Sequence, residues 1–462
     1  MRRSLIASIV VLAPAVAPVA AHADEWSLHV LGSASTAWTD NLTSQPDGNI
    51  NHRSDVYSQL QPGALFSYET HRSIHELTYN LDVSFYGNLN TPPGAADTEP
   101  SLTHHAGWRG FFMTSPLSEL STGLGFSAGT INTFGTTAPA GTPRDTIQPA
   151  GTDFRQWDAT ENFSYTMSAA WRMTQSLLAR RFESIVGASG AMQQRTISTG
   201  SDAGLTFGLD RAWRDDAVGG SVGARYVTLE RENPEPMGGV TTEDNITVQG
   251  LLAWRRDISQ RWNSVLDAGA TALVPINAGE HFTLQPTVGG TLAYAPNWGS
   301  ASLQARRSVA PNLAIARNTV SDSVFLNAGL PLPWLASDPG EPRLALQATV
   351  GGSRTRIIDT LSDDVTDGIN VLVGDVALSY RAASALHVIL RYQYLRQTSD
   401  AELANSFDRQ TVQLQLFGRW PDRQAAEIPA RDSLRVDRSG NTAVGDEAGA
   451  AGGAGASAGA SR

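Results

Sequence analysis

The feature that most constrains the fold of this chain is the alternation of apolar and polar residues at every second position. In the stretch 407–420, one face of an extended chain carries Val412, Leu414, Leu416, Gly418 and Trp420. The opposite face carries Thr411, Gln413, Gln415, Phe417 and Arg419. Successive side chains of a β-strand point to opposite sides, so this stretch predicts a strand between an apolar and a polar environment. A single strand of this kind fits a soluble sandwich as well as a membrane protein.

The same alternation recurs through residues 26–420. The stretch 77–85 is a clear example, because Leu77, Tyr79, Leu81, Val83 and Phe85 alternate with Thr78, Asn80, Asp82 and Ser84. The stretches 26–40 and 56–68 show the same alternation of apolar and polar residues. The pattern is least regular at 175–186 and 320–332. Repetition over nearly the whole chain predicts an all-β fold of about 18 strands.

The segments between the predicted strands alternate between short and long. Short connections lie near residues 70–73, 115–116, 173–174, 214–215, 258–259, 296–297, 337–338 and 383–384. Longer ones, rich in turn-forming residues, lie near 89–103, 132–153, 188–195, 231–243, 276–281, 310–319, 358–367 and 400–405. Short turns on one side and long loops on the other are typical of outer-membrane barrels. We predict a single transmembrane, antiparallel, up-and-down β-barrel with short periplasmic turns and long extracellular loops.

The two ends of the chain differ from this pattern. Residues 1–23 have a basic start, a short apolar run and the sequence Ala21-His22-Ala23, which indicate a signal peptide. The predicted barrel spans residues 24–421. Residues 422–462 begin with a charged segment and end in Gly, Ala and Ser, so a disordered periplasmic tail is expected. These features predict localisation in the outer membrane.

Composition and motifs exclude several kinds of function. The chain has no cysteine, which rules out disulfides and thiolate metal sites. A net charge of −11 argues against nucleic acid as a partner. No phosphate-binding loop, nucleophile elbow or zinc motif is present. His104 and His105 are adjacent and would point in opposite directions on a strand, which makes them a poor metal chelate. We expect no enzymatic activity, no metal and no cofactor.

The inner face of the predicted barrel carries charged and amide side chains. In the predicted register, His387 also faces inward, as a lumen-lining residue rather than a catalytic base. The pore-lining candidates are Arg109, Arg225, Arg255, Arg306, Arg343, Asp375, Arg381, Arg391, Gln413, Gln415 and Arg419. Arg381, Arg391 and Arg419 are predicted on the last three strands and could form one cationic patch near the periplasmic mouth. The alternative is that Asp375 and nearby carboxylates neutralise them.

One stretch suggests a specific relationship. Asp40-Asn41-Leu42 after the first strand and the proline-containing second strand, 55–62, resemble the start of β-barrel porins associated with exopolysaccharide secretion. The resemblance implies an outer-membrane exit for a secreted polysaccharide, with periplasmic export proteins as partners. A diffusion or substrate-specific porin for small hydrophilic solutes, and a structural or adhesin barrel, are the alternatives. The loop 132–153 is predicted to fold inward and narrow the pore.

Overall fold

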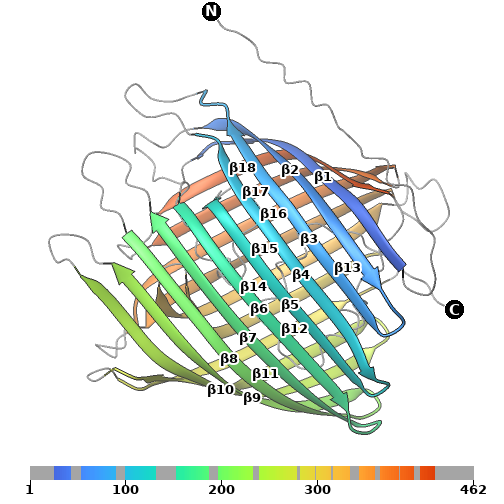
Figure 1. Ribbon diagram of the computed structural model, residues 1–462, viewed down its shortest axis with the longest axis vertical. Helices are drawn as coiled ribbons and strands as arrows, with labels where there is room; N and C mark the ends of the chain where they lie inside the picture. Colours follow the sequence, from blue (N-terminus) through green and yellow to red (C-terminus); the bar gives the residue numbers. More distant parts are fainter. Residues whose placement is uncertain are drawn as a thin grey trace, which may run out of the picture.

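The structure is a computed structural model and describes residues 25–42, 54–89, 99–131, 152–186, 196–232, 239–277, 281–296, 298–313, 316–332, 343–358, 365–383, 385–399 and 406–421. These residues form one sheet of 18 antiparallel strands (Figure 1). No helix among them is long and apolar enough to cross a membrane.

The strands follow one another in sequence around the sheet. Their bounds are β1 Glu25–Thr39, β2 Asp55–Glu69, β3 Ser73–Tyr86, β4 Ser101–Ser115, β5 Ser118–Ile131, β6 Thr152–Thr166, β7 Trp171–Val186, β8 Thr196–Ala212 and β9 Asp216–Glu232. The second half consists of β10 Val240–Ser259, β11 Trp262–Pro275, β12 Thr283–Tyr294, β13 Ser300–Asn312, β14 Arg317–Leu332, β15 Leu344–Ile358, β16 Val365–Ala383, β17 Leu386–Ser399 and β18 Phe407–Trp420. The predicted strand number and up-and-down order are confirmed.

The sheet closes on itself because the first strand pairs with the last. The β1–β18 register runs from Val30 opposite Trp420 to Thr39 opposite Thr411. We call the end of the barrel where β1 begins and β18 ends the termini end, and the opposite end the loop end. Closure leaves no free sheet edge at this junction, which is what a membrane requires of a sheet.

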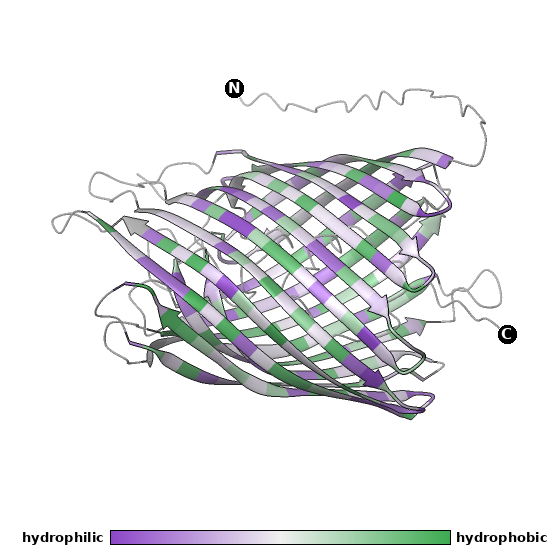
Figure 2. Cartoon of the chain, turned by 60° about the horizontal axis from the view of Figure 1, so that its bottom comes forward, coloured by the Kyte–Doolittle hydropathy of each residue, from purple (hydrophilic) through white to green (hydrophobic). Residues whose placement is uncertain are grey.

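The alternation of the sequence separates two environments. Large apolar side chains are exposed on the outside of the barrel, among them Leu77, Leu124, Leu252 and Leu414. Figure 2 shows hydrophobic and hydrophilic residues alternating along the strands. On β18, the predicted outer residues Val412, Leu414, Leu416 and Trp420 are all exposed. A closed barrel with this apolar outer surface is the architecture of outer-membrane proteins.

Two prolines mark interruptions in the ladder. Pro62 and its neighbour Gln61 have no partner on β3, although residues on both sides of them are paired. Pro286 lies on β12 just beyond the point where pairing between β12 and β13 ends. Proline cannot donate a hydrogen bond to a neighbouring strand, and the sequence predicts such a break at Pro62.

The predicted connections are confirmed at most positions, but the short one expected at 173–174 lies within β7, because β6 ends at Thr166 and β7 begins at Trp171. A second difference is at the loop end. The segment 310–319 was expected to be a long loop, but β13 continues to Asn312 and β14 begins at Arg317. The expectation was wrong because β13 and β14 extend into this segment and stay paired up to Asn312 opposite Arg317. The predicted turn at 337–338 and residues 132–151 of the predicted inward loop lie outside the described residues, as do residues 1–24 and 422–462.

Candidate functional site

The register places the predicted pore-lining residues on the inner face of the barrel. Arg391 lies opposite Gln413 on β18, and Arg381 lies opposite His387 on β17. Gln413, Gln415 and Arg419 lie on the face opposite the exposed apolar residues of β18. The same alternation directs Arg109, Arg225, Arg255, Arg306 and Asp375 inward, and Arg343 immediately precedes β15 on the inward side.

The predicted cationic patch is neutralised at one of its three positions. The Nε atom of Arg391 donates a hydrogen bond to Asp375 Oδ2 over 2.5 Å. Arg419 lies at the termini end, with its Nε atom 3.4 Å from His29 Nδ1. His29 in turn lies 3.0 Å from the carbonyl oxygen of Pro421. For Arg391, the structure therefore agrees with the salt-bridged alternative.

Removing the carboxylate of Asp375 tests how this pair influences ion passage. In Asp375→Asn, Arg391 keeps its charge and loses its counterion, so we expect selectivity to shift toward anions at low ionic strength. Arg391→Gln should shift it toward cations. Reversal potentials in planar bilayers measure the ion selectivity of both variants. Glu183→Gln, which removes a carboxylate from the outer face, is the control, and equal shifts in all three variants would contradict a lumenal role.

The main departure from a simple open barrel is the hairpin formed by the loop-end parts of β13 and β14, residues 308–321. Pairing between β12 and β13 runs only from Tyr294–Ala301 to Val288–Arg307. Beyond that point, Thr283–Thr287 of β12 pairs with β11 alone. β13 and β14 remain paired with each other up to Asn312 and Arg317, and β14 remains paired with β15 up to Asn318, so the hairpin separates from β12 but stays joined to the wall through β15.

The base of the hairpin packs beneath the neighbouring strands. Val309 and Val320 form a buried cluster with Ile358 of β15 and with Leu273 of β11. Leu273 lies on the inward face of β11, opposite Thr247 and two residues from Thr271, which is fully buried. The hairpin therefore passes under the inner surface of β11 and β12 and enters the lumen.

The tip of the hairpin reaches the wall formed by β6–β9. Leu313 and Ala316 form a buried cluster with Phe154, Phe182, Val227 and Leu229, all of them on the inward faces of their strands. A Cβ atom built on Gly200 of β8 would lie 2.8 Å from Leu313 Cβ, so any larger residue there would require the tip to shift. Strands are about 4.8 Å apart, so the four intervals from β9 to β13 span at least ~19 Å of wall. The hairpin crosses the lumen.

The backbone and charges at the tip support this docked position. Ala316 has a φ of 49°, an unfavourable left-handed conformation for a residue with a side chain. It is only 3% exposed, so packing holds the turn in place. The next residue, Arg317, forms an ion pair with Glu243 on the inward face of β10. Apolar contacts and one salt bridge thus fix the tip to the far wall.

A buried ionic cluster lies on the same wall. Asp202 of β8 accepts hydrogen bonds from Arg180 of β7, over 2.5 Å, and lies 3.7 Å from Arg225 of β9. The side chains of Arg180 and Asp202 are 3% and 0% exposed. The Arg180–Asp202 pair is therefore closed to water, whereas the side chain of Arg225 is 27% exposed. The cluster stiffens the surface on which the hairpin docks.

Two further groups of apolar residues lie on the inner face near the loop end. Leu42 packs on Ala37 and Tyr57, and Ile369 packs with Leu395 and Phe407. A wide wet pore would expose these side chains. The inner surface is therefore polar toward the termini end and largely buried at the loop end.

The predicted opposite orientation of the two adjacent histidines is confirmed. His105 points inward, with Nε2 3.4 Å from Asp82 and Nδ1 2.9 Å from Ser127 Oγ. His104 is on the outer face, where Nδ1 lies 2.8 Å from the hydroxyl of Tyr79. Within the described ranges, no group of three or more His, Asp or Glu side chains could hold a metal ion.

The hairpin is the functional feature that the sequence analysis missed. A signal for it exists, because residues 308–321 carry Val309, Leu313, Ile315 and Val320 and no acidic residue. The predicted loops at 231–243 and 358–367, by contrast, are rich in Asp and Glu. An apolar segment between two strands at the loop end has to be buried, and the lumen is the nearest place.

Comparisons with known proteins agree with the general fold only. No family model and no curated protein matches the chain. Three similar solved structures are "Copper transporter OprC", OccAB3 of Acinetobacter baumannii, and a mutant of the ferric enterobactin receptor of Pseudomonas aeruginosa in complex with enterobactin. Their TM-scores are 0.44, 0.42 and 0.45, with identities of 8%, 10% and 8%. The matches cover 81%, 85% and 85% of this chain, and 61%, 99% and 81% of the respective structures, so the chain spans under two thirds of OprC.

These likenesses are too weak to indicate a cargo. The closed ladder and the apolar outer surface decide the class of protein. The chain is an outer-membrane β-barrel. Its candidate functional site is the lumen, with the hairpin 308–321 lying across it.

Proposed function

We propose that this chain is a gated outer-membrane pore, in which the β13–β14 hairpin controls the passage of a hydrophilic cargo. The observation that carries the proposal is the docking of Leu313 and Ala316 on the wall of β6–β9, four to seven strands away from β13. This hairpin is released from β12 on one side, stays paired with β15 on the other, and touches the wall of β6–β9 through a small apolar contact. Segments of this kind are suited to move between two positions.

The cargo that we propose is a secreted polysaccharide leaving the cell, handed over by periplasmic export proteins. Support comes from the resemblance of residues 40–62 to porins associated with exopolysaccharide secretion. The inner face adds Gln, Ser, Thr and Arg, which can hydrogen-bond sugar hydroxyls. Phe417 and His387 pack against each other on that face, with ring centroids 6.4 Å apart, and present ring surfaces suited to sugars. We expect no catalytic activity.

Deletion of the gene tests this cargo. We expect cell-surface polysaccharide to be lost, with small-solute permeability intact, because the exit route alone is removed. Surface polysaccharide is measured by staining and by sugar analysis of shed material. Complementation with the intact gene is the control. Normal surface polysaccharide combined with reduced uptake of a solute would instead favour the porin alternative.

A further inference from the structure

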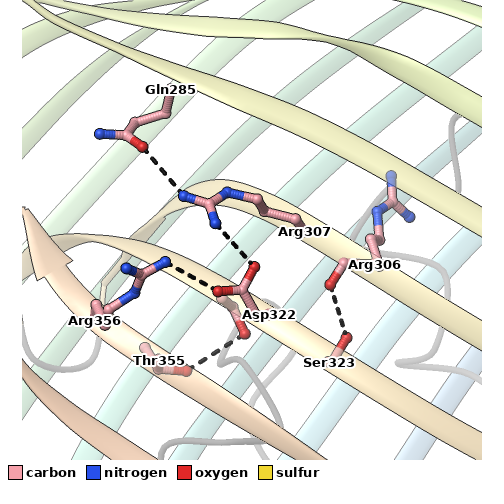
Figure 3. A network of polar contacts seen from close by, with 8 residues as sticks. Gln285, Arg306, Arg307, Asp322, Ser323, Thr355 and Arg356 are labelled. Atoms are coloured by element: carbon pink, nitrogen blue, oxygen red, sulfur yellow. Dashed lines mark hydrogen bonds and ion pairs between the residues drawn. The ribbon is translucent and has the colours of Figure 1, made fainter.

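A cluster of arginines lies where the β13–β14 hairpin leaves the wall. Arg307 of β13 lies between Asp322 of β14 and Gln285 of β12, with N–O distances of 3.4 Å to each (Figure 3). Arg356 of β15 donates to the other oxygen of Asp322 over 3.0 Å. Beside these, Arg354 lies opposite Asp322 in the β14–β15 register. Two guanidinium groups, those of Arg307 and Arg356, therefore share one carboxylate, and Arg354 is the neighbouring third.

Arg354 lies on the face of β15 that meets the membrane, and Arg307 lies on the same face of β13 at the point where β13 separates from β12, within reach of the inward side chain of Gln285. On β15, the residues preceding Arg354 on the same face are Leu344, Leu346, Ala348, Val350 and Gly352. On β13, Leu303 and Ala305 lie between Arg307 and the termini end of the barrel. On β14, Val324 and Leu326 lie between Asp322 and the same end. Val350, Val324 and Leu303 are 56%, 52% and 46% exposed, which identifies this face as the outer one. The change from apolar to charged residues occurs at the same level on three adjacent strands.

The height of the cluster matches the border of the hydrocarbon layer. Arg354 is ten positions along β15 from Leu344 at the termini end (354 − 344). At a rise of about 3.3 Å per residue and a tilt of about 45°, this corresponds to about 23 Å along the membrane normal. The apolar band of outer-membrane barrels is about 25 Å tall. The guanidinium groups therefore lie at the level of the lipid headgroups on the loop-end side.

The donors of the cluster exceed the acceptors that the protein provides. Each guanidinium has five N–H donors. Arg354 is exposed and has no ion pair or hydrogen bond among the described residues, where it lies against Gly368. The Nε atoms of Arg307 and Arg356 are buried and donate no hydrogen bond there either. A ligand with several anionic oxygens would satisfy the exposed N–H groups of Arg354 and the terminal nitrogens of Arg307 and Arg356, whose side chains are 27% and 26% exposed.

We infer that Arg307, Arg354 and Arg356 form a binding site for the phosphate-bearing headgroup of a lipid in the outer leaflet. Guanidinium groups match phosphate in charge and in bidentate geometry. The surrounding apolar residues of β13–β15 supply a surface for the acyl chains. The site also covers the seam, which is the place where β12 and β13 stop pairing. A bound headgroup would therefore cover the wall where these two strands are no longer hydrogen-bonded to each other.

Nanodiscs test the site with a defined lipid. The full-length barrel is placed in phosphatidylcholine, with and without bisphosphorylated lipid A, and lipid A binding is measured by native mass spectrometry and by the shift in melting temperature. Arg354→Gln/Arg356→Gln should bind lipid A at least about tenfold more weakly, the loss expected for hydrogen bonds to charged groups. Arg354→Gln alone breaks no described ion pair and should lower the affinity for lipid A by a smaller factor. This single variant replaces the double variant in the test if the double variant fails to fold.

Matched controls separate this site from general attraction. Arg396, whose Nε lies 3.6 Å from Asp408, is a second exposed arginine near the loop end, and Arg396→Gln should bind lipid A as the wild type does. Equal binding by wild type and Arg354→Gln/Arg356→Gln would overturn the inference, as would equal binding of dephosphorylated lipid A. Stabilisation by inorganic phosphate as strong as that by lipid A would assign the site to free phosphate instead. Binding that needs divalent cations and ignores the arginines would also overturn it.

Discussion

A disulfide between the hairpin tip and the far wall is expected to hold the pore in its low-conductance state. The protein has no cysteine, so the pair Gly200→Cys/Leu313→Cys introduces the only two thiols. Gly200 and Leu313 are close enough for a bridge after a small outward shift, because a Cβ on Gly200 would lie 2.8 Å from Leu313 Cβ and bridged Cβ atoms are about 3.8 Å apart. Under oxidising conditions, single-channel recordings should show opening events that become rare. A reductant should restore them.

The opposite variant should favour opening. Leu313→Ala removes the largest apolar contact of the tip, at an expected cost of about 2–5 kcal/mol for a buried leucine. That loss lowers the ratio of docked to undocked hairpin at least about twentyfold. Mean conductance should rise accordingly.

A second engineered disulfide is the control for both variants. Thr36→Cys/Ser58→Cys joins β1 and β2 in the wall, where the two native hydroxyls lie 2.8 Å apart, and touches no part of the hairpin. Its oxidation should leave conductance unchanged. If the locked, the undocked and the control proteins all conduct alike, the hairpin neither blocks nor gates the pore.

The buried carboxylate of Asp202 is expected to be the most important single charge for stability. Asp202→Asn leaves the buried Arg180 and the partly exposed Arg225 without this counterion. Removing one partner of a buried ion pair costs about 3–5 kcal/mol. We expect the midpoint of denaturant-induced unfolding in lipid vesicles to fall accordingly, followed by tryptophan fluorescence.

An exposed ion pair provides the comparison for Asp202. Arg181 and Glu183 lie on the outer face, with side chains 57% and 29% exposed and 2.8 Å apart. Glu183→Gln should cost less than about 1 kcal/mol, as is usual for surface pairs. A loss of stability in Asp202→Asn no greater than that in Glu183→Gln would mean that Asp158, directly opposite Arg180, compensates for the missing charge.

The fold could be predicted from the sequence because a barrel in a membrane imposes a strict two-residue period. Most outward positions have to be apolar, so the outer face of a strand can be recognised in the sequence from residues such as Val412, Leu414 and Leu416 on β18. Strand number follows from counting the turns between alternating segments. The inward orientation of Arg391 and Arg419 follows from the same period.

The hairpin and the seam could not be predicted in this way. The sequence shows that Val309 and Leu313 are apolar, but their partners Leu273 and Phe182 are distant in sequence and belong to other strands. Alternation also continues through the departure of β13 from the wall, because the hairpin keeps its own ladder. Two features mark the site in the sequence: the stretch 308–321, which carries no acidic residue, and Pro286, which cannot donate to a neighbouring strand.

Closure of the ring between β1 and β18 has a consequence for how the protein is made. Val30 meets Trp420 across 390 positions of sequence (420 − 30), so the first strand cannot acquire its second neighbour until the last strand has been delivered. Until then both edges carry unpaired backbone groups, which hydrocarbon does not tolerate. Something other than the chain itself has to cover those edges during insertion. A protein shortened by β18 would therefore be expected to fail at assembly, before any question of transport arises.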